Sequence, residues 1–478
     1  MNRLNPSDLG QVHFIGLGGA GMSAVARVLL AQGVPVSGSD AKDSPGLRAL
    51  AALGAETFVG HDAAHVAGVD TVVVSTAIRE QNPELAEARR RGLRIIHRSV
   101  ALSAAMGAQD LVAVAGTHGK TTTTAMVTVM LREAGLDPSF AIGGDVAALG
   151  VNAAHGAGRI FVAEADESDG SFLNYTPQII VVTNVEADHL DHYGTEEAVF
   201  ASFDAFAALL PADGLLVACA DDPGALGLAR RSPGSRVATY GYDAGADVRV
   251  LETRPLGAGS SSILRYNVDG AAGEVRLDLR VPGAHNILNA AAAFTVALGL
   301  GVDPETAAAG LATFTGAARR FESRGTVRGV RVFDDYAHHP TEVHAALKAA
   351  RTVAGGHRVH VIFQPHLFSR TRNFAVEFAA ALDLADTATV LDIYPAREDP
   401  IEGVTSELIT SRLHVDGGFE SDPERAVARV ADAAREGDII LTVGAGDVTR
   451  LGTELVDRLA ATADLTAVPG TPKAPDGR

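Results

Sequence analysis

Short runs rich in β-branched residues alternate with alanine-rich stretches of helical composition along almost the whole chain. The first series of β-rich runs reads QVHFIG, VPVSGSD, TVVVSTA and LRIIHRS, and the second reads DLVAVAG, RIFVAEAD, PQIIVVTN and GLLVACA. A third series comprises VRVFDDYA, RVHVIFQP, TATVLDIYPA and DIILTVGAG. Strands that alternate with helices form βαβ units and mostly parallel sheets. The pattern therefore predicts an α/β fold.

One stretch breaks this alternation and helps to divide the chain. Residues 237–281 alternate polar and apolar side chains between glycine turns, as in SSSILRYNVDGAAGEVRLDLRV, which indicates antiparallel strands. At 478 residues the chain is too long for one core. We predict a Rossmann-like domain, a central P-loop-type domain with a parallel sheet and a small antiparallel sheet, a second Rossmann-like domain and a disordered tail. Their predicted limits are 1–108, 109–325, 326–468 and 469–478.

Composition excludes several classes of protein. The net charge of −18 argues against binding to a nucleic-acid backbone, which depends on Lys and Arg. Apolar runs of about 20 residues, the length that spans a bilayer, do not occur, and the N-terminus lacks the apolar segment of a secretion signal. The single cysteine, Cys219, reads as a buried apolar residue and fits a reducing compartment. We expect a cytoplasmic protein, with no nucleic-acid or membrane partner, that is a monomer or a weak homodimer.

The first glycine loop, IGLGGAG, follows a predicted strand and opens a predicted helix. Its spacing fits G-x-G-x-x-G, in which glycines let the backbone approach a diphosphate and the helix N-terminus offers N–H groups. Asp40 ends the next strand and suits a ribose hydroxyl, and STAIR (75–79) ends another strand of the same domain. Tight strand-to-helix packing without a ligand is the alternative. The candidate residues are Gly16, Gly18, Gly19, Ala20, Gly21, Asp40, Ser75 and Thr76.

The second glycine loop, AGTHGKTTTT, also lies between a predicted strand and a predicted helix. Only Thr117 and His118 separate Gly116 from Gly119-Lys120, whereas the common phosphate-binding loop has four residues there. A tight turn at the glycines would still let backbone amides hold a triphosphate, with Lys120 on the outer phosphates. A threonine-rich helix cap is the alternative. The candidate residues are Gly116, Thr117, His118, Gly119, Lys120, Thr121 and Thr122.

This short loop resembles the ATP site of the Mur ligases, which build the peptide of bacterial cell-wall precursors. Further segments resemble motifs of that family in the same order. They are EADESDGSF (164–172), TNVEADHLDHYG (183–194), GAHNILNAAAA (283–293), ARRFE (318–322), DDYAHHPTE (334–342), FQPHLFSRT (363–371) and VGAGD (443–447). IGLGGAGMSAVA together with DDYAHHPTE is most similar to the branch that joins L-alanine to UDP-N-acetylmuramate, so the resemblance covers nearly the whole chain.

The resemblance implies an ATP-dependent carboxylate–amine ligase of peptidoglycan synthesis that uses Mg²⁺, with two ions expected and Mn²⁺ as a substitute. It implies the metal ligands Thr121, Glu164 and His189. A histidine is an unusual Mg²⁺ ligand, because Mg²⁺ prefers oxygen. The further ATP-binding residues that it implies are Asn286, Asn289, Arg320 and Asp335. The L-alanine-binding residues that it implies are Tyr336, His338 and Arg370, and the catalytic residues are Lys120, His189 and His338, of which His338 is a candidate to accept the amine proton.

Two sequence details refine this prediction. Several sister ligases carry a lysine, carbamylated in use, after the segment that corresponds to DHLD, but residues 196–210 contain no lysine. This fits the alanine-adding branch and leaves a second metal ion to Glu164 and phosphate oxygens. His189-x-x-His192 and His338-His339 suggest zinc, but neither has a complete ligand set at zinc spacing.

Other functions remain open from the sequence alone. The first glycine loop by itself would suit a nicotinamide-dependent dehydrogenase, although that leaves the second loop and EADESDGSF without a purpose. A non-catalytic nucleotide sensor would also bind ATP. Within the family, a recycling ligase that joins a ready-made tripeptide to the same UDP-sugar is the nearest alternative.

Overall fold

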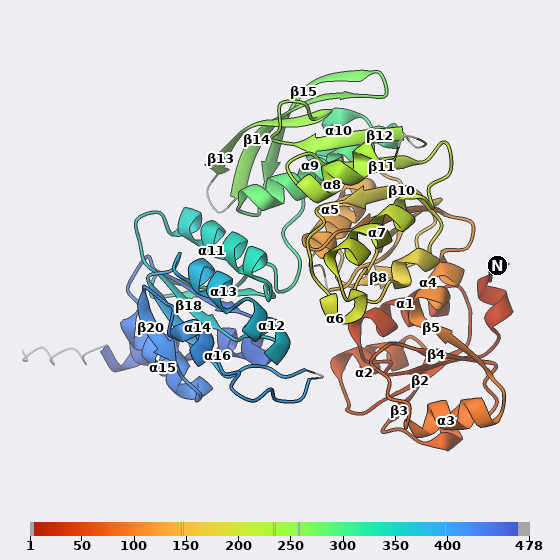
Figure 1. The fold of residues 1–478 in the computed structure, drawn as a ribbon, viewed down its shortest axis with the longest axis horizontal. Helices are drawn as coiled ribbons and strands as arrows, with labels where there is room; N and C mark the ends of the chain where they lie inside the picture. The colour runs from red at the N-terminus through yellow and green to blue at the C-terminus, as the bar shows by residue number, and fades with distance from the viewer. Residues whose placement is uncertain are drawn as a thin grey trace, which may run out of the picture. The chain divides into compact units, whose positions relative to one another are not determined.

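The computed structural model describes residues 4–466 except 145, 147, 233, 235, 257, 258 and 397; side chains are not described for 191 and 462–466. The predicted tail, 469–478, lies outside the described residues. The chain divides into two compact units, Met1–Ala317 and Ala318–Arg478. Two of the three sheets belong to the first unit and one belongs to the second (Figure 1).

The first sheet (red and orange in Figure 1) is entirely parallel, with the strand order β3-β2-β1-β4-β5. Its strands are β1 (Val12–Ile15), β2 (Val36–Asp40), β3 (Glu56–Val59), β4 (Thr71–Val74) and β5 (Arg94–His97). The helices of this region are η1 (Pro6–Leu9), α1 (Ala20–Ala31), α2 (Pro45–Ala52), η2 (Ala63–Val66), α3 (Pro83–Arg90) and α4 (Arg98–Met106). The chain runs outward from β1 to β3 and then returns to β4, so the order reverses between β1 and β4. Open α/β sheets bind ligands at the carboxyl ends of strands at such a reversal.

The second sheet has ten strands in the order β15-β14-β13-β12-β11-β10-β6-β9-β7-β8. The central strands are parallel, whereas β13, β14 and β15 pair antiparallel and join the parallel part through β12. The strands are β6 (Asp110–Ala115), β7 (Ser139–Ala141), β8 (Ala153–Ala154), β9 (Ile160–Glu164), β10 (Pro177–Val182), β11 (Leu215–Cys219), β12 (Arg236–Gly241), β13 (Val248–Leu256), β14 (Gly259–Val268) and β15 (Ala271–Leu279). The helices are α5 (Lys120–Glu133), η3 (Ser171–Asn174), α6 (Leu190–Tyr193), α7 (Glu196–Ala207), α8 (Pro223–Arg230), α9 (Ala284–Gly299) and α10 (Pro304–Leu311).

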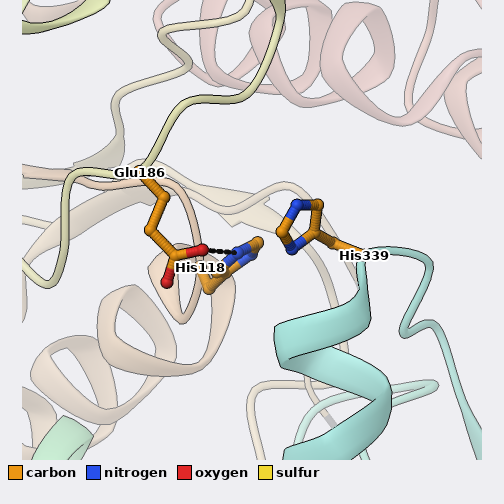
Figure 2. Close-up of side chains that lie close together, drawn as sticks. All are labelled: His118, Glu186 and His339. Atoms are coloured by element: carbon orange, nitrogen blue, oxygen red, sulfur yellow. Dashed lines mark ion pairs between the residues drawn. The ribbon is translucent and has the colours of Figure 1, made fainter. Parts of the chain in front are cut away.

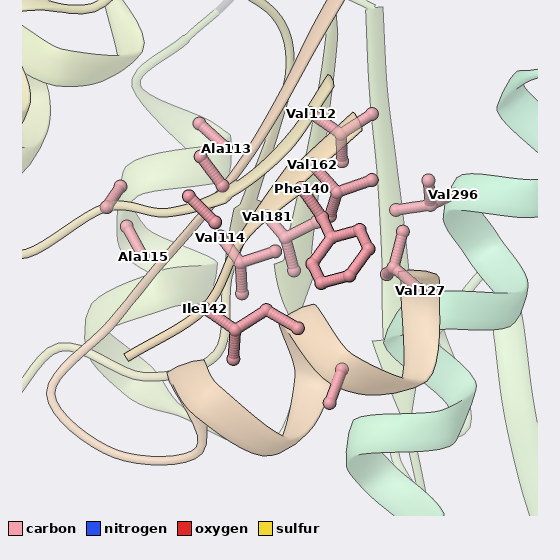
Figure 3. Packing of buried hydrophobic residues seen from close by; sticks show 14 of the residues in the cluster. Val112, Ala113, Val114, Ala115, Val127, Phe140, Ile142, Val162, Val181 and Val296 are labelled. Carbon is pink, nitrogen blue, oxygen red and sulfur yellow. The ribbon is translucent and has the colours of Figure 1, made fainter. Parts of the chain in front are cut away.

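Valine side chains of the central strands fill the space between the second sheet and helices α5 and α9 (Figure 3). The labelled side chains that meet there include Val112, Val114, Val162 and Val181 of the strands, Phe140 of β7, Val127 of α5 and Val296 of α9. Each fully buried side chain of this size contributes about 1.5–3 kcal/mol relative to exposure. Helix α5 is therefore held firmly on the sheet, and the loop between β6 and α5 is fixed at both ends.

The third sheet forms the core of the second unit, with the order β16-β17-β21-β18-β19-β20. Only β16 is antiparallel to its neighbour. The strands are β16 (Glu322–Val327), β17 (Val330–Asp335), β18 (Val359–Phe363), β19 (Thr387–Val390), β20 (Asp416–Phe419) and β21 (Ile439–Val443). The helices are α11 (Pro340–Ala354), α12 (Phe368–Asn373), α13 (Ala375–Leu382), α14 (Glu407–Thr410), α15 (Pro423–Ala433), η4 (Asp447–Thr449) and α16 (Arg450–Thr466).

The predicted fold class is confirmed, since the sheets are mostly parallel and the antiparallel strands lie where the alternation changes. Five strands were not predicted: β3, β7, β8, β16 and β20. Strands β3, β16 and β20 lie at the edge of a sheet and are partly exposed, so they lack a clear β-rich run. Strands β7 and β8 have only three and two residues, which is too short for a distinct run. The boundary predicted near 325 falls within β16, whereas the second compact unit begins at Ala318. Cys219 is buried, as predicted. In the part of the chain that the structure describes, no helix has the length and apolar character to cross a bilayer.

Candidate active site

The second glycine loop is short because its two glycines adopt conformations that other residues avoid. Gly116 has φ +130° and Gly119, which caps α5, has φ +84°. A Cβ atom on Gly116 would lie 2.1 Å from the Thr183 hydroxyl oxygen. The geometry therefore requires glycine at position 116, and the chain turns from β6 into α5 with only two residues between the glycines.

The strand next to β6 braces this loop. Thr183 and Asn184 directly follow β10, and the Thr183 hydroxyl donates a 2.5 Å hydrogen bond to the His118 carbonyl. The Asn184 side chain accepts from the His118 amide at 2.8 Å and donates to its carbonyl at 3.1 Å. His118 Nε2 also lies 3.4 Å from a carboxylate oxygen of Glu186 (Figure 2). The first two residues of the TNVEADHLD segment thus hold the loop in shape.

Lys120 is the first residue of α5, and its ammonium group is enclosed by acceptors. Nζ donates to the carbonyl oxygens of Gly116 and Thr117 at 2.7 and 3.1 Å and to Glu167 Oε1 at 2.8 Å. Burial favours the neutral amine, but the charges of Glu167 and nearby acids outweigh it and raise the pKa of Lys120. Lys120 is therefore a fixed cation at the start of α5, where a phosphate would meet both its charge and the helix N-terminus.

Glu167 was not predicted as a site residue. It is 2% exposed, and its Oε2 atom has no hydrogen-bond partner among the described residues. Burial raises the pKa of this carboxyl to about 7, even though the Lys120 ammonium opposes the rise. A buried carboxyl oxygen without a partner is costly, and such groups gather where ligands bind. The only sequence signal was a second glutamate in EADESDGSF.

The expected metal ligands lie near the same loop but form two pairs. The Thr121 hydroxyl lies 3.1 and 3.0 Å from the two carboxylate oxygens of Glu164, which also accepts the Gly143 amide at 2.8 Å. His189, with a left-handed backbone (φ +55°), has its Nε2 3.7 Å from Glu167 Oε1. A Cβ on Gly143 would lie 2.6 Å from Glu164, so glycine keeps this space open. Hydroxyl and carboxylate oxygens beside a phosphate-binding turn fit Mg²⁺.

The two asparagines expected near the adenine lie on α9 and are nearly buried. Asn286 donates to the Pro282 carbonyl at 2.7 Å. A Cβ on Gly119 would lie 2.9 Å from Asn289 Oδ1, so Asn289 lies against the second loop. Thr117 and Thr122 of the loop region are also nearly buried.

The first glycine loop leaves β1 and opens α1 through Gly19, which is exposed together with Ala20. In the described region, no side chain caps the first turn of α1. Asp40 accepts the Gly18 amide at 2.9 Å. The expected ribose ligand is therefore already in contact with the loop.

Two other chain segments border this loop. A Cβ on Gly16 would lie 3.3 Å from Ile78, which places the loop after β4, with half-buried Ser75 and exposed Thr76, beside it. A Cβ on Gly21 would lie 2.9 Å from Arg98 Nη1. Arg98 was not predicted as a site residue.

In the second unit, the ARRFE segment wraps around the end of β17. The Arg319 and Arg320 guanidinium groups lie 4.8 and 5.4 Å from the centre of the Tyr336 ring. The two carboxylate oxygens of Asp335 accept the Phe321 and Ala337 amides, each at 2.8 Å. Burial raises the pKa of Asp335 to about 6, although the Arg320 charge opposes the rise. Asp335 therefore fixes the ARRFE segment, and a ribose contact would use its remaining lone pairs.

His338 lies beside Tyr336 at the start of α11. Its Nδ1 lies 3.1 Å from the Tyr336 carbonyl and 3.3 Å from Glu342 Oε2, so Nδ1 carries the proton and Nε2 keeps a lone pair. Burial lowers the pKa of His338 to about 3, and the Glu342 charge only partly opposes this. The ring is therefore neutral at pH 7 and can accept a hydrogen bond from an amine.

Arg370 and His366 complete this cluster. Arg370 is 8% exposed on α12, and its positive charge helps to lower the pKa of His338. The His366 ring lies 5.7 Å from that of His338 and stacks on Tyr394 at 5.8 Å. His366 was not predicted, although it stands in the FQPHLFSRT segment. An arginine and the neutral imidazole of His338 suit a small molecule that carries a carboxylate and an amine.

Comparisons with known proteins match most of the chain to one family. Residues 11–110 match the model described as "Mur ligase family, catalytic domain", residues 114–297 match "Mur ligase middle domain", and residues 319–446 match "Mur ligase, glutamate ligase domain". The UDP-N-acetylmuramate–L-alanine ligase of Renibacterium salmoninarum is 63% identical over 459 residues, 96% of this chain and 97% of that protein. The same ligase of Cutibacterium acnes is 53% identical over 463 residues, 95% of this chain and 97% of that protein.

Solved structures agree with these matches. The UDP-N-acetylmuramate-alanine ligase of Thermotoga maritima has a TM-score of 0.80 at 29% identity and covers 95% of this chain and 99% of its own. A murein peptide ligase of Psychrobacter arcticus has a TM-score of 0.71 at 25% identity and covers 94% of this chain and 98% of its own.

Proposed function

The chain belongs to the Mur ligase family, and from that premise we propose that it joins L-alanine to the lactyl carboxylate of UDP-N-acetylmuramate using ATP. The products are the alanyl UDP-sugar, ADP and phosphate. This is the reaction that the names of its relatives at 63% and 53% identity describe. The chain is an enzyme of peptidoglycan precursor synthesis. This assignment excludes the alternatives of a nicotinamide-dependent dehydrogenase and a non-catalytic nucleotide sensor.

The observation that carries the proposal is the braced second loop with Lys120 at the start of α5. A carboxylate does not react with an amine directly, because its oxygen is a poor leaving group. Transfer of the γ-phosphoryl group of ATP to the lactyl carboxylate gives an acyl phosphate, which the amine of L-alanine then attacks. Catalysis of phosphoryl transfer depends on positioning and on cations around the moving group. Lys120 is the cation that the loop holds in place for this step.

We assign different parts of ATP and its metal ions to different residues in and around the second loop. Backbone amides of Gly116 and from Gly119 to Thr122 bind the triphosphate. Thr117 and His118, whose amides are bonded to Asn184, shape the loop beside it. Asn286 and Asn289 flank the adenine. Thr121, Glu164 and His189 would hold Mg²⁺, two ions in all, and Mn²⁺ would substitute. When bound, the metal neutralises charge on the phosphates. The distance of 3.7 Å between His189 Nε2 and Glu167 Oε1 places His189 close to the Lys120–Glu167 pair.

The second unit would supply the amino acid. Arg370 binds the carboxylate of L-alanine by a two-pronged ion pair, and Tyr336 and His338 flank it. Nε2 of His338 accepts a hydrogen bond from the amine, but its low pKa makes it a weak store for a proton. We further propose Arg320 as a ligand of the ATP phosphates and Asp335 as a ligand of the ATP ribose.

The first loop would bind UDP-N-acetylmuramate. Ala20 and Gly21 offer backbone amides to the diphosphate, whereas Gly16, Gly18 and Gly19, whose amides are bonded to Ser39, Asp40 and Gly16, let the backbone approach it. The remaining contacts come from Asp40, Ser75 and Thr76. All substrates are small soluble molecules, and we place the enzyme in the cytoplasm as a monomer or a weak homodimer.

The decisive experiment offers two acceptors side by side. Purified protein is incubated with labelled UDP-N-acetylmuramate, Mg-ATP and either L-alanine or the tripeptide L-alanyl-γ-D-glutamyl-meso-diaminopimelate. We expect ADP release and a labelled product only with L-alanine. Product with the tripeptide alone would make the chain a recycling ligase. No ADP release with either acceptor would remove the proposed reaction.

A further inference from the structure

The junction of β5 and α4 makes a dense polar contact with the acidic segment that follows β9. Consecutive residues at the start of α4 each reach a different residue of this segment. His97 Nε2 lies 3.5 Å from Asp169 Oδ2, Arg98 Nη2 donates to Asp166 Oδ2 at 2.6 Å, and Asn174 Nδ2 donates to Ser99 Oγ at 2.9 Å. Part of the first sheet's region is therefore built onto the segment that lines the second loop.

Arg98 also lies against the first loop. Its Nη1 atom would be 2.9 Å, and its Cδ atom 3.9 Å, from a Cβ on Gly21, the second residue of α1. Its side chain is 24% exposed. One guanidinium group thus contacts Asp166 and at the same time covers the helix turn whose amides are available to a diphosphate. The glycine loop itself, residues 16–21, contains no cation.

Asp166 and Glu167 are adjacent and hold one cation from each side. Asp166 binds Arg98 at 2.6 Å, and Glu167 binds Lys120 at 2.8 Å. Asp166 thus lies between the two cations, with Arg98 on its own carboxylate and Lys120 on that of the next residue. The backbone is fixed as well, because Asp166 Oδ1 accepts the Ser168 amide at 3.0 Å.

A second contact ties α1 to the same region. The side chain of Asn152, which precedes β8 and is 6% exposed, donates to the Ala20 carbonyl at 3.1 Å. Ala20 is the first residue of α1. The start of α1 is thus bonded to Asn152, next to β8 of the second sheet, and lies against Arg98.

We propose that Arg98 is a positioning residue that binds the diphosphate of UDP-N-acetylmuramate and, through Asp166-Glu167, couples this binding to the placement of Lys120 at the ATP phosphates. The inference rests on the proposed function, because it takes the UDP-sugar and ATP as the two ligands. A diphosphate at the first loop attracts the Arg98 guanidinium and so alters the contact between Arg98 and Asp166. Because Glu167 directly follows Asp166, this alters the contact between Glu167 and Lys120. The two ligands therefore bind cooperatively.

The test measures this cooperativity by calorimetry. The affinity for a non-hydrolysable ATP analogue with Mg²⁺ is measured with and without saturating UDP-N-acetylmuramate. For the wild-type protein we expect the UDP-sugar to tighten analogue binding about tenfold, within the range usual for coupled sites. In Arg98→Met we expect this ratio to fall to within about twofold of unity. Affinity for the UDP-sugar itself should fall roughly tenfold, because a cation next to the diphosphate is lost.

Two further variants separate coupling from simple loss of charge. Asp166→Asn retains the arginine but removes the carboxylate that it contacts, so the affinity ratio should again fall close to unity. The double variant should lose no more of the cooperativity than either single variant. Arg98→Lys should recover part of the UDP-sugar affinity but little of the coupling, because one ammonium cannot reach both partners. The matched control is Arg89→Met, which removes an arginine from an exposed ion pair with Glu80 in the same region and should leave the ratio unchanged.

The outcomes that overturn the inference are distinct from failure of the proposed function. A wild-type ratio of unity, or an Arg98→Met protein that keeps the wild-type ratio, would refute the coupling. If Arg98→Met does not fold, the ratio in Asp166→Asn decides the matter. If the wild-type protein neither binds the UDP-sugar nor makes alanyl product, the proposed function has failed instead.

Discussion

The two glycine loops of the first unit share one design and differ in where their charges come from. Each loop leaves a parallel strand and opens a helix through a glycine, so each offers uncapped backbone amides. The second loop carries Lys120 within its own motif and is braced by Thr183 and Asn184. The first loop has no cation of its own, and Arg98 reaches it from the far end of the first sheet. The amides of a helix N-terminus are enough to bind a phosphate group. Catalysis at that phosphate also requires a fixed cation beside it.

Two buried acids show the same contrast. Glu84 at the start of α3 is fully buried and accepts hydrogen bonds from Ser39 at 2.6 Å and His65 at 2.7 Å. Burial opposes its ionisation, but the contact with His13 Nε2 at 3.6 Å and the hydrogen bonds of Ser39 and His65 outweigh this and lower the pKa of Glu84 to about 2. Glu167 instead keeps one oxygen without a partner in the described part of the chain, and its pKa is raised. Glu84 stabilises the fold. Glu167 has a buried oxygen without a partner among the described residues, which destabilises the fold until a ligand bonds to it.

The largest expected effect comes from removal of the second loop's own cation. Lys120→Ala should lower alanine-dependent ADP release by roughly a thousandfold or more, because a fixed charge at the moving phosphoryl group is lost. The affinity for UDP-N-acetylmuramate, measured by calorimetry, should change little. Lys348→Ala, which removes an exposed lysine of α11, is the control and should be as active as the wild type. Near-normal turnover of Lys120→Ala would contradict the assignment of this loop to ATP.

Glu84→Gln tests the structural acid. We expect a loss of about 3 kcal/mol in the free energy of unfolding, because the partners of a buried carboxylate are left unsatisfied. The folded pKa of about 2 lies below the ordinary 4.5, so the contribution of Glu84 is complete above about pH 4.5 and is lost as the pH falls towards 2. Denaturant unfolding of both proteins between pH 7 and pH 3 should show the difference shrinking with acid. A difference independent of pH would contradict this account.

The controls for that experiment use the same substitution elsewhere. Glu80→Gln, in an exposed ion pair, should have no measurable effect on unfolding. Glu167→Gln should cost activity more than stability, because its carboxyl is already incompletely bonded. Equal losses of stability in Glu84→Gln and Glu167→Gln would remove the contrast between the two acids.

The brace on the second loop gives a smaller effect. Thr183→Val keeps the shape of the side chain but removes the hydrogen bond to the His118 carbonyl. We expect KM for ATP to rise about tenfold, in line with the loss of one buried hydrogen bond, and KM for the UDP-sugar to stay unchanged. Steady-state kinetics with each substrate varied in turn provide the measurement. Thr352→Val, on the exposed face of α11, serves as the control, and a rise in both KM values would show a general loss of structure.

The smallest effect is expected at the first loop. A Cβ in Gly18→Ala would lie 2.9 Å from Asp40 Oδ2 and Ser44 Oγ, and both side chains can move aside. KM for the UDP-sugar should rise about fivefold, a cost of roughly 1 kcal/mol, whereas KM for ATP should not change. Gly356→Ala, which has nothing within 4 Å of the new Cβ, is the control. An effect on ATP alone would reverse the assignment of the two loops.

Much of the candidate site could be predicted from local sequence. The glycines of both loops and Lys120 stand in short motifs that directly follow strands, and Glu164 ends one. The structure places the Thr121 hydroxyl against Glu164, and a metal ion there stays a prediction. The pairing of His189 with Glu167 could not be predicted, because it depends on where α6 begins relative to β9. His366 was missed because a single histidine after a strand has no distinctive pattern.

The sequence by itself determined the alternation of strands and helices, the two glycine loops and the order of the motifs, because backbone conformation and side-chain periodicity are local properties. Only the tertiary structure decided which charges meet. Lys120 and Glu167 are 47 residues apart, and Arg98 and Asp166 are 68 apart. Their contacts follow from the order in which the strands lie in the sheets and from the packing of α4 on the acidic segment, neither of which a local pattern records.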